Sequence, residues 1–202
     1  VRNTGFKVGV NLLRNSGREA YAIAVTTKAR FIRVNTLVDT ILSDSGIIEP
    51  EAPRLKPIVH NYPGIEIYAD ILVKHATSPR PVLGFIESSS MILSRGAPEE
   101  YLRDLIDDYV ERGRASTLVV TGLRTGEPLP FHLVRLVKRY SSIPVLVGSG
   151  VSAENIKTIL REVDGVIVGS FVKRDGKAGN QVDPERARSL IQRAMSESRI
   201  KI

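Results

Sequence analysis

The sequence predicts an α/β protein built around a parallel β-sheet, and three observations predict it. Short β-rich runs alternate with helical patterns six times along the 202 residues, which is the order typical of parallel sheets. Runs such as Leu118-Val119-Val120 are continuously aliphatic, as expected for strands covered on both faces. With 42% hydrophobic and 25% charged residues, the chain has an ordinary globular composition, and we expect one domain over residues 1–202.

The first half of the chain contains the first three strands. These are expected at residues 7–13, 30–36 and 65–72, and helices at 17–28 and 50–60 follow the first two. A helix at 98–112 is expected to begin at Pro98, since proline favours the first turn, and to stop at Gly113. The connection 37–50 is too long for a minimal turn, and it is predicted to form either a lid over a site or a packed Ω-loop.

The second half repeats the strand-helix unit three times. The strands are expected at residues 116–121, 143–148 and 165–169, and the helices at 130–140, 152–163 and 183–196. Ser152 is the expected N-cap of its helix, and Asp183 precedes Pro184 in the first turn of the last helix.

Two architectures fit this order of elements, a doubly wound open sheet and a TIM (β/α)8-type barrel. The segment Val8-Gly9-Val10-Asn11 lacks the glycine fingerprint that follows the first strand of dinucleotide-binding open sheets. A barrel typically takes about 250 residues, and six units are visible here. We therefore expect a TIM-type barrel that is incomplete at its N-terminus by two strand-helix units, about 50 residues in total. A second copy of the chain is expected to cover the open strand edges, which favours a homo-oligomer.

Composition excludes several functional classes. No apolar run approaches the ~18 residues of a membrane-spanning helix, and residues 1–7 lack the apolar stretch of a secretory signal. The absence of cysteine excludes disulfides and thiolate sites, and the three histidines show no ligand-like spacing. We therefore expect a cytoplasmic protein without membrane insertion, and we assign no metal site. The net charge of +7 comes from basic residues scattered among acids, which favours small anionic ligands over nucleic acid.

Polar residues cluster where the predicted strands end, which is where parallel α/β folds bind their ligands. Asp70, Lys74 and His75 form the strongest acid-base group, because a carboxylate, an ammonium and an imidazole on one loop tune one another's proton affinity. We assign these three residues as candidate catalytic residues. The alternative is a solvated loop with a surface ion pair.

Five other strand-end residues are candidates for binding a substrate. They are Asn11, Arg14, Asn35, Thr121 and Thr125. Their amides, hydroxyls and cation suit hydrogen bonding to a sugar or phosphate, whereas each asparagine alone also suits ordinary loop capping.

Two small-residue turns follow the last two strands. Gly148-Ser149-Gly150 precedes a helix, and Gly169-Ser170 ends the next strand. Barrels often bind phosphate with the loops after strands seven and eight, so these five residues are predicted to cradle a phosphate through backbone amides. Alternatively, the glycines only permit tight turns.

Seven ordered blocks of the chain resemble the BtpA family. The blocks are residues 9–15 (GVNLLRN), 31–35 (FIRVN), 69–75 (ADILVKH), 120–122 (VTG), 125–126 (TG), 144–150 (PVLVGSG) and 164–170 (DGVIVGS). The resemblance covers about residues 7–193 and implies a TIM-barrel fold, in which members normally begin with two further strand-helix units. The family includes the SgcQ-like proteins. Some members are named as photosystem I biogenesis proteins, and others are named as nucleosidases.

Two functional classes follow from the residues and the resemblance together. The first is an enzyme, of lyase, nucleosidase-like hydrolase or isomerase type, acting on a phosphorylated sugar or nucleoside-like molecule at the strand ends. In that hypothesis Asp70 is the acid-base residue, Lys74 and His75 stabilise negative charge or share proton transfer, and Arg14 pairs with an anionic group. The second is a non-catalytic assembly factor that uses the barrel as a scaffold. The sequence identifies no cofactor.

Overall fold

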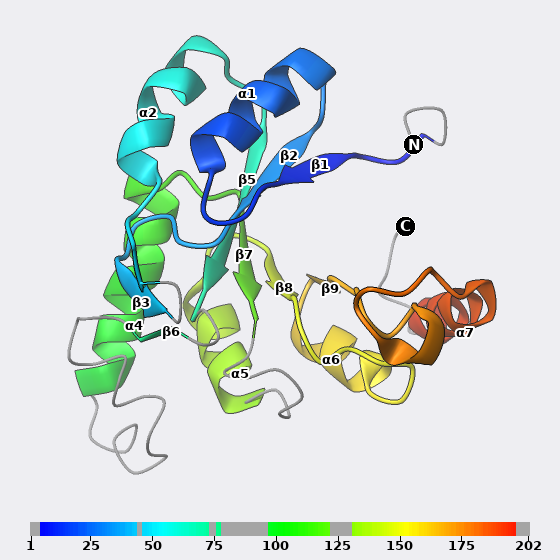
Figure 1. Cartoon of the computed structure of the whole chain (residues 1–202). Helices are drawn as coiled ribbons and strands as arrows, with labels where there is room; N and C mark the ends of the chain where they lie inside the picture. Colours follow the sequence, from blue (N-terminus) through cyan, green and yellow to red (C-terminus); the bar gives the residue numbers. More distant parts are fainter. Residues whose placement is uncertain (1–4, 44–45, 73–75, 78–96, 122–130, 197–202) are drawn as a thin grey trace.

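The computed structural model of the protein describes residues 5–43, 46–72, 76–77, 97–121 and 131–196. Its main element is a parallel sheet of six strands (Figure 1). The strands are β1 (Gly9–Asn11), β2 (Phe31–Val34), β5 (Glu66–Ile71), β7 (Thr117–Val120), β8 (Val145–Val147) and β9 (Gly165–Val166), and they pair in this order. Each strand is therefore the spatial neighbour of the strand that follows it in this series, as in a barrel.

Helices alternate with these strands along the chain. They are α1 (Gly17–Thr27), α2 (Ala52–Asn61), α4 (Ala97–Asp107), α5 (Phe131–Tyr140), α6 (Ile156–Glu162) and α7 (Pro184–Met195). A π-helical turn, η3 (Asp108–Arg112), continues α4, and a short 3-10 turn, η4 (Arg174–Gly176), lies between β9 and α7. Figure 1 shows the sheet curling, with α1, α2, α4 and α5 on its outer side.

The hydrophobic core lies between the outer face of the sheet and these helices. The sheet contributes buried aliphatic side chains from four strands: Ile32, Val34, Ile67, Ala69, Ile71, Leu118, Val120, Val145 and Val147. Helix residues such as Tyr21, Leu55 and Ile106 are buried against them. Because side chains alternate along a strand, the residues between these core positions point to the inner, concave face.

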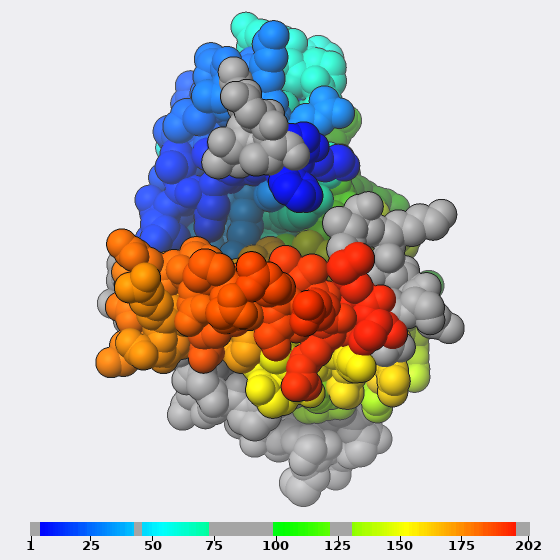
Figure 2. Space-filling view, turned by 90° about the vertical axis from the view of Figure 1, so that its right-hand side faces the viewer, coloured from blue at the N-terminus to red at the C-terminus, as the bar shows by residue number. Residues whose placement is uncertain are grey.

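The concave face differs from the core in composition. The rings of Phe31 and Tyr68 stack there, with their centroids 4.4 Å apart, and each ring remains partly exposed. Figure 2 looks onto the opening of the curl, where a recess separates the N-terminal elements in blue from the C-terminal segment in orange and red. The concave face of the curled sheet is therefore turned toward this recess.

The connection between β2 and α2 is more ordered than the sequence predicted. It contains β3 (Ile41–Ser43) and β4 (Gly46–Ile48), which pair antiparallel, and β6 (Ala76–Thr77) adds to them in the order β4-β3-β6. The Ω-loop alternative is therefore wrong, because isoleucines and a leucine in this segment suit strand pairing. Its role as a lid stays a prediction.

The predicted order of strands and helices is confirmed along the described chain. The six predicted strands are those of the parallel sheet, and their ends differ from prediction by a few residues. The described residues form a curled half-barrel, and a closed eight-stranded barrel is not seen among them. Within these same ranges, no helix combines the length and apolarity needed to cross a membrane.

Candidate functional site

The carboxyl ends of β2 and β5 hold a partly buried cluster of three polar side chains. Arg33 donates from Nε to Oδ1 of Asp70 at 2.8 Å and from Nη2 to Oδ2 at 3.1 Å. Asn35 donates from Nδ2 to the same Oδ2 at 3.1 Å. Both oxygens of Asp70 are thus engaged, and the residue is only 1% exposed. The bidentate geometry is the strong form of an arginine-carboxylate pair.

Strand register explains why these residues meet. Val34 pairs with Ala69 across β2 and β5, so the next residues along each strand, Asn35 and Asp70, lie side by side. Arg33 precedes Asn35 by two residues and therefore points to the same face. On the other side, Asn11 is the register partner of Arg33, which places the predicted binding residue Asn11 at the edge of the cluster.

Arg33 also reaches toward the first glycine turn. A Cβ atom built on Gly148, at the end of β8, would lie 3.5 Å from Nη2 of Arg33, 3.5 Å from Cγ2 of Thr121 and 2.8 Å from Cγ1 of Val119. A side chain at this position would therefore crowd Val119 and approach the guanidinium. The cluster around Asp70 and the predicted phosphate turn thus lie next to each other, although they were predicted from separate features of the sequence.

Thr121 lies between these two parts of the site, after the end of β7. It is 3% exposed, and its buried hydroxyl has no hydrogen-bond partner among the described residues. Buried hydroxyls usually have a partner, so Thr121 stays a candidate binding residue. The structure thus places Thr121 where the sequence predicted a binding residue.

The loop after β8 is held by side-chain hydrogen bonds. Nδ2 of Asn155 donates to the carbonyl of Gly150 at 2.7 Å, and its Oδ1 accepts from the amide of Ser152 at 2.8 Å. Within the part of the chain that the structure describes, the amides of Ser149 and Gly150 have no acceptor. The turn therefore presents free N–H groups on a rigid loop.

The remaining candidates are more scattered. Gly169 and Ser170 are exposed after β9, and Arg14 is exposed in the loop between β1 and α1. Lys74, His75 and Thr125 lie outside the described residues. The catalytic, substrate-binding and phosphate-binding roles of all these residues stay predictions. No group of three or more histidine, aspartate or glutamate side chains is placed to hold a metal ion within the described ranges.

Sequence reasoning missed Arg33 as a site residue. A signal was available, because Arg33 is a charged residue inside the otherwise apolar strand Phe31-Ile32-Arg33-Val34. A charge in such a strand requires a partner, and Asp70, near the end of the next parallel strand, was the nearest acid at the matching position. Only the register shows that the two meet.

Asn15 supports the loops of the site from within the fold. Its Nδ2 donates to the carbonyls of Thr36 and Glu49 at 3.0 and 2.8 Å, and its Oδ1 accepts from the amide of Thr36 at 2.9 Å. Asn15 is 5% exposed. It therefore ties the loop after β1 to the loop after β2, and so holds the ends of both strands in place.

A buried tyrosine on the helix side of the sheet has a pKa that depends on the charge of nearby carboxylates. Tyr109 belongs to η3 and is 2% exposed. Burial raises the pKa of the Tyr109 hydroxyl, and the negative charges of Asp39 and Asp70 raise this pKa further. Tyr109 is therefore a neutral hydroxyl at physiological pH.

Comparison with known proteins identifies the family. The model of the BtpA family matches residues 2–196. This chain belongs to the BtpA family. The resemblance drawn from the seven sequence blocks is therefore confirmed.

Two relatives illustrate the breadth of the BtpA family. An uncharacterized protein of Thermococcus kodakarensis is 40% identical over 188 residues, which are 93% of this chain and 64% of the relative. The photosystem I biogenesis protein BtpA of Synechocystis sp. is 35% identical over 192 residues, which are 94% of this chain and 60% of that protein. The BtpA-family chain therefore spans less than two thirds of these two relatives.

Solved structures share the fold of this BtpA-family chain. A native structure of KDPGal aligns with a TM-score of 0.57 at 13% identity, covering 95% of this chain and 70% of that one. Tryptophan synthase from M. tuberculosis aligns with a TM-score of 0.56 at 18% identity, covering 100% of this chain and 65% of that one. Identities this low show the fold alone, so the comparison supports a barrel-like α/β architecture and leaves the activity to the site.

Proposed function

We propose that this BtpA-family chain binds the phosphate group of a phosphorylated sugar or nucleoside-like small molecule at the carboxyl ends of its strands. The observation that carries the proposal is the position of Arg33, whose guanidinium is held by Asp70 and lies beside Gly148. A guanidinium fixed next to a glycine turn with free amides is a recurrent way to hold phosphate. Thr121 adds a buried hydroxyl without a partner.

Donor count supports an anion at this position. A guanidinium has five N–H donors, and Asp70 accepts one bond from Nε and one from Nη2. The remaining donors, including both on Nη1, have no acceptor among the described residues. The carboxylate offsets the charge of Arg33, so the free amides of Ser149 and Gly150 and the predicted cation Lys74 would supply the rest of the attraction.

We propose an enzyme acting on this ligand, with the chemistry next to the phosphate. Asp70 remains the acid-base candidate, together with Lys74 and His75. Because three N–H donors already engage the Asp70 carboxylate, an orienting role toward Arg33 and Asn35 is the alternative for this residue. The two roles separate in the variant Asp70→Asn, which removes proton transfer but keeps the shape of the side chain. Under the acid-base role turnover is abolished and ligand binding is kept, whereas under the orienting role binding weakens as well.

The binding proposal is tested by thermal unfolding in the presence of phosphosugars, nucleotides, nucleosides and inorganic phosphate. A ligand at about 100 times its dissociation constant stabilises the folded state by ~2.7 kcal/mol, which corresponds to a shift of several degrees for a domain of this size. Ser149→Asp places a negative charge on the glycine turn and should abolish the shift. Ser142→Asp is the matched control, because Ser142 is exposed before β8, at the opposite end of the strand.

The outcomes of the thermal-unfolding experiment distinguish a protein that binds a phosphorylated ligand from one that serves only as a scaffold. We expect a shift with phosphorylated compounds only, lost in Ser149→Asp and kept in Ser142→Asp. A shift that survives Ser149→Asp would place the ligand elsewhere. The absence of a shift with every compound would overturn the phosphate site and favour the scaffold class.

We also propose that the six strands belong to a (β/α)8-type barrel completed by further strands or by a partner copy. The spatial order of these six strands equals their order in the chain. Among the described strands, β1 and β9 each have one unpaired edge, which favours pairing with other strands. Sedimentation equilibrium tests the partner copy. If a partner copy completes the barrel, we expect a homo-oligomer, and a monomer at high micromolar concentration would contradict completion by a partner copy.

A further inference from the structure

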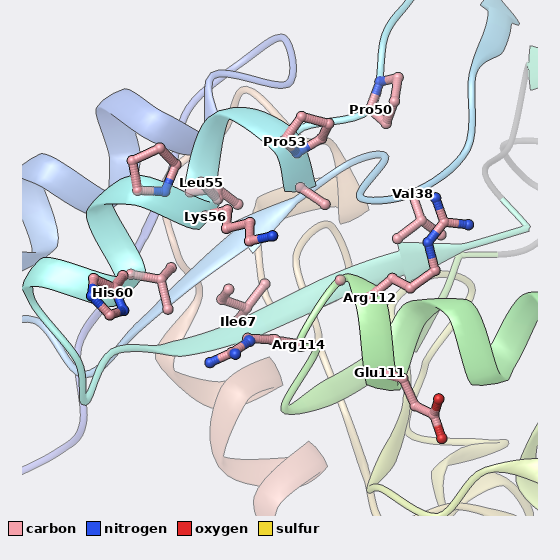
Figure 3. Close-up of a pocket in the computed structure, with 14 residues that line it drawn as sticks. Val38, Pro50, Pro53, Leu55, Lys56, His60, Ile67, Glu111, Arg112 and Arg114 are labelled. Atoms are coloured by element: carbon pink, nitrogen blue, oxygen red, sulfur yellow. The ribbon is translucent and has the colours of Figure 1, made fainter.

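A second cavity lies on the opposite side of the sheet from the strand-end site. It lies between α2 and the end of η3, where the layer of outer helices has a gap, and Figure 3 shows it from close range. Its volume is about 780 Å³, within the range of ~300–1,000 Å³ that is typical of small-molecule pockets. We call this cavity the α2–η3 groove.

The floor of the α2–η3 groove is apolar. Leu55 and Val59 come from α2, Ile67 from β5, and Val38 from the loop after β2. Leu55 and Ile67 are each 2% exposed, so these side chains are part of the wall of the core rather than of a mobile surface. A groove with this floor favours a ligand with an apolar body.

The rim of the α2–η3 groove is cationic. Lys56, Arg112 and Arg114 line it from three directions, and Figure 3 shows the carboxylate of Glu111 directed away from its centre. Arg112 pairs with Asp108 on its own helix at 3.1 Å. Lys56 and Arg114 have no acidic partner among the residues that the structure describes. Two cations are therefore available above an apolar floor.

Arg114 is held in place by its backbone. Its φ of 55° is in the left-handed region, which is unfavourable for a non-glycine residue. The flanking amides fix this conformation, because Gly113 donates to the carbonyl of Asp108 at 2.9 Å and Ala115 donates to that of Tyr109 at 3.0 Å. The base of the Arg114 side chain is thus fixed at the end of the groove.

We propose that the α2–η3 groove binds a small amphipathic anion, namely a phosphate monoester or carboxylate attached to an aromatic or branched aliphatic body. The anionic group pairs with Lys56 and Arg114, and the apolar body lies on Leu55, Val59 and Ile67. Neither inorganic phosphate nor a neutral aromatic compound satisfies both surfaces. The site is independent of the strand-end site, since it shares no residue with it.

Phenyl phosphate is the probe, and amide chemical-shift mapping on the whole chain is the measurement. We expect shifts at residues 55–60 and 113–115 that saturate with phenyl phosphate, and at least tenfold weaker binding of inorganic phosphate and of phenol. The variant Lys56→Gln/Arg114→Asn removes both cations, and asparagine tolerates the left-handed conformation of Arg114. It should weaken phenyl phosphate binding at least tenfold. Lys157→Gln/Arg103→Gln is the matched control, because both residues are exposed helix positions outside the groove.

A neutral variant tests the apolar floor. Val59→Phe fills part of the groove without changing charge, and it should also weaken binding. Equal affinity in Lys56→Gln/Arg114→Asn and in the control would overturn the proposal. Shifts confined to residues 148–150 would do the same, while supporting the strand-end phosphate site, so the two proposals fail separately.

Discussion

Arg33 on β2 and Asp70 on β5 form a bidentate pair in which one partner is far more buried than the other. The side chain of Asp70 is 2% exposed and that of Arg33 is 21% exposed. The carboxylate of Asp70 accepts from both Nε and Nη2 of Arg33 and so fixes the guanidinium. The unequal burial of the two partners has measurable consequences.

Replacing Arg33 and replacing Asp70 should lower the free energy of unfolding by unequal amounts. Arg33→Met leaves a buried carboxylate without its cation, which costs about 3–5 kcal/mol. Asp70→Asn leaves a guanidinium that is partly solvated. Its loss in the free energy of unfolding should be roughly 1–3 kcal/mol smaller than the loss in Arg33→Met. Urea denaturation followed by circular dichroism at pH 7 measures both.

The control for this pair is Arg135→Met. Arg135 makes the same bidentate contact with Glu162, at 3.0 and 2.7 Å, but on the surface between α5 and α6. Surface pairs contribute little because water and salt screen them. A stability loss in Arg135→Met as large as that in Arg33→Met would contradict the role of burial.

Asn15 should be one of the most sensitive polar residues of the fold. Asn15→Ala removes three hydrogen bonds and leaves the amide and carbonyl of the fully buried Thr36 without these partners. We expect a loss of about 3 kcal/mol in the free energy of unfolding. Asn15→Gly separates the loss of hydrogen bonds from the effect of backbone conformation. Glycine accepts the φ of 52°, so this variant should be roughly 1 kcal/mol more stable than Asn15→Ala. Equal stability of the two variants would mean that backbone conformation contributes nothing here.

Gly113 is required by packing rather than by backbone conformation. A Cβ atom there would lie 2.7 Å from Cδ2 of Leu37 and 2.8 Å from the carbonyl oxygen of Tyr109. Gly113→Ala should therefore destabilise the fold by ~1–3 kcal/mol, seen as a drop of several degrees in Tm. Gly179→Ala is the control, since a Cβ at Gly179 meets no atom within 4 Å. A Tm of Gly113→Ala equal to that of the control would show that the turn relaxes freely.

Tyr109 should make the protein sensitive to alkali. The pKa of its hydroxyl is raised in the folded state by burial and by Asp39 and Asp70. A raised folded-state pKa stabilises the fold fully below the ordinary tyrosine pKa of about 10, and this contribution is lost as pH rises beyond that value. The free energy of unfolding should therefore fall more steeply between pH 9 and 11 in the parent protein than in Tyr109→Phe. Tyr62→Phe, at a position that is 55% exposed, is the control and should leave the slope as in the parent. Identical slopes in all three proteins would show that Tyr109 does not cause the sensitivity to alkali.

Much of the architecture could be predicted from local patterns. The aliphatic run at residues 116–121 became β7 (Thr117–Val120), and Pro184 after Asp183 began α7 as expected. The hairpin of β3 and β4 was missed, because each strand is only three residues long. In addition, β3 pairs with β6, which lies farther along the chain. Such short strands have no periodicity that a window of sequence can detect.

The candidate site was predicted in part. Asn35, Asp70, Thr121 and Gly148 lie together at the strand ends, as expected from parallel topology. Arg33 was not predicted to join them. The α2–η3 groove was not predicted either, because it is lined by residues from separate parts of the chain, such as His60 and Arg114.

The sequence by itself determined the alternation of strands and helices, the family, and the end of the sheet at which polar residues gather. These features depend on periodicity and on residue types within about ten positions of one another. The tertiary structure alone decided that Arg33 meets Asp70, that its guanidinium reaches Gly148, and that a gap opens between α2 and η3. Those relationships depend on strand register, on the curl of the sheet and on helix packing, because each joins residues that are tens of positions apart in the chain.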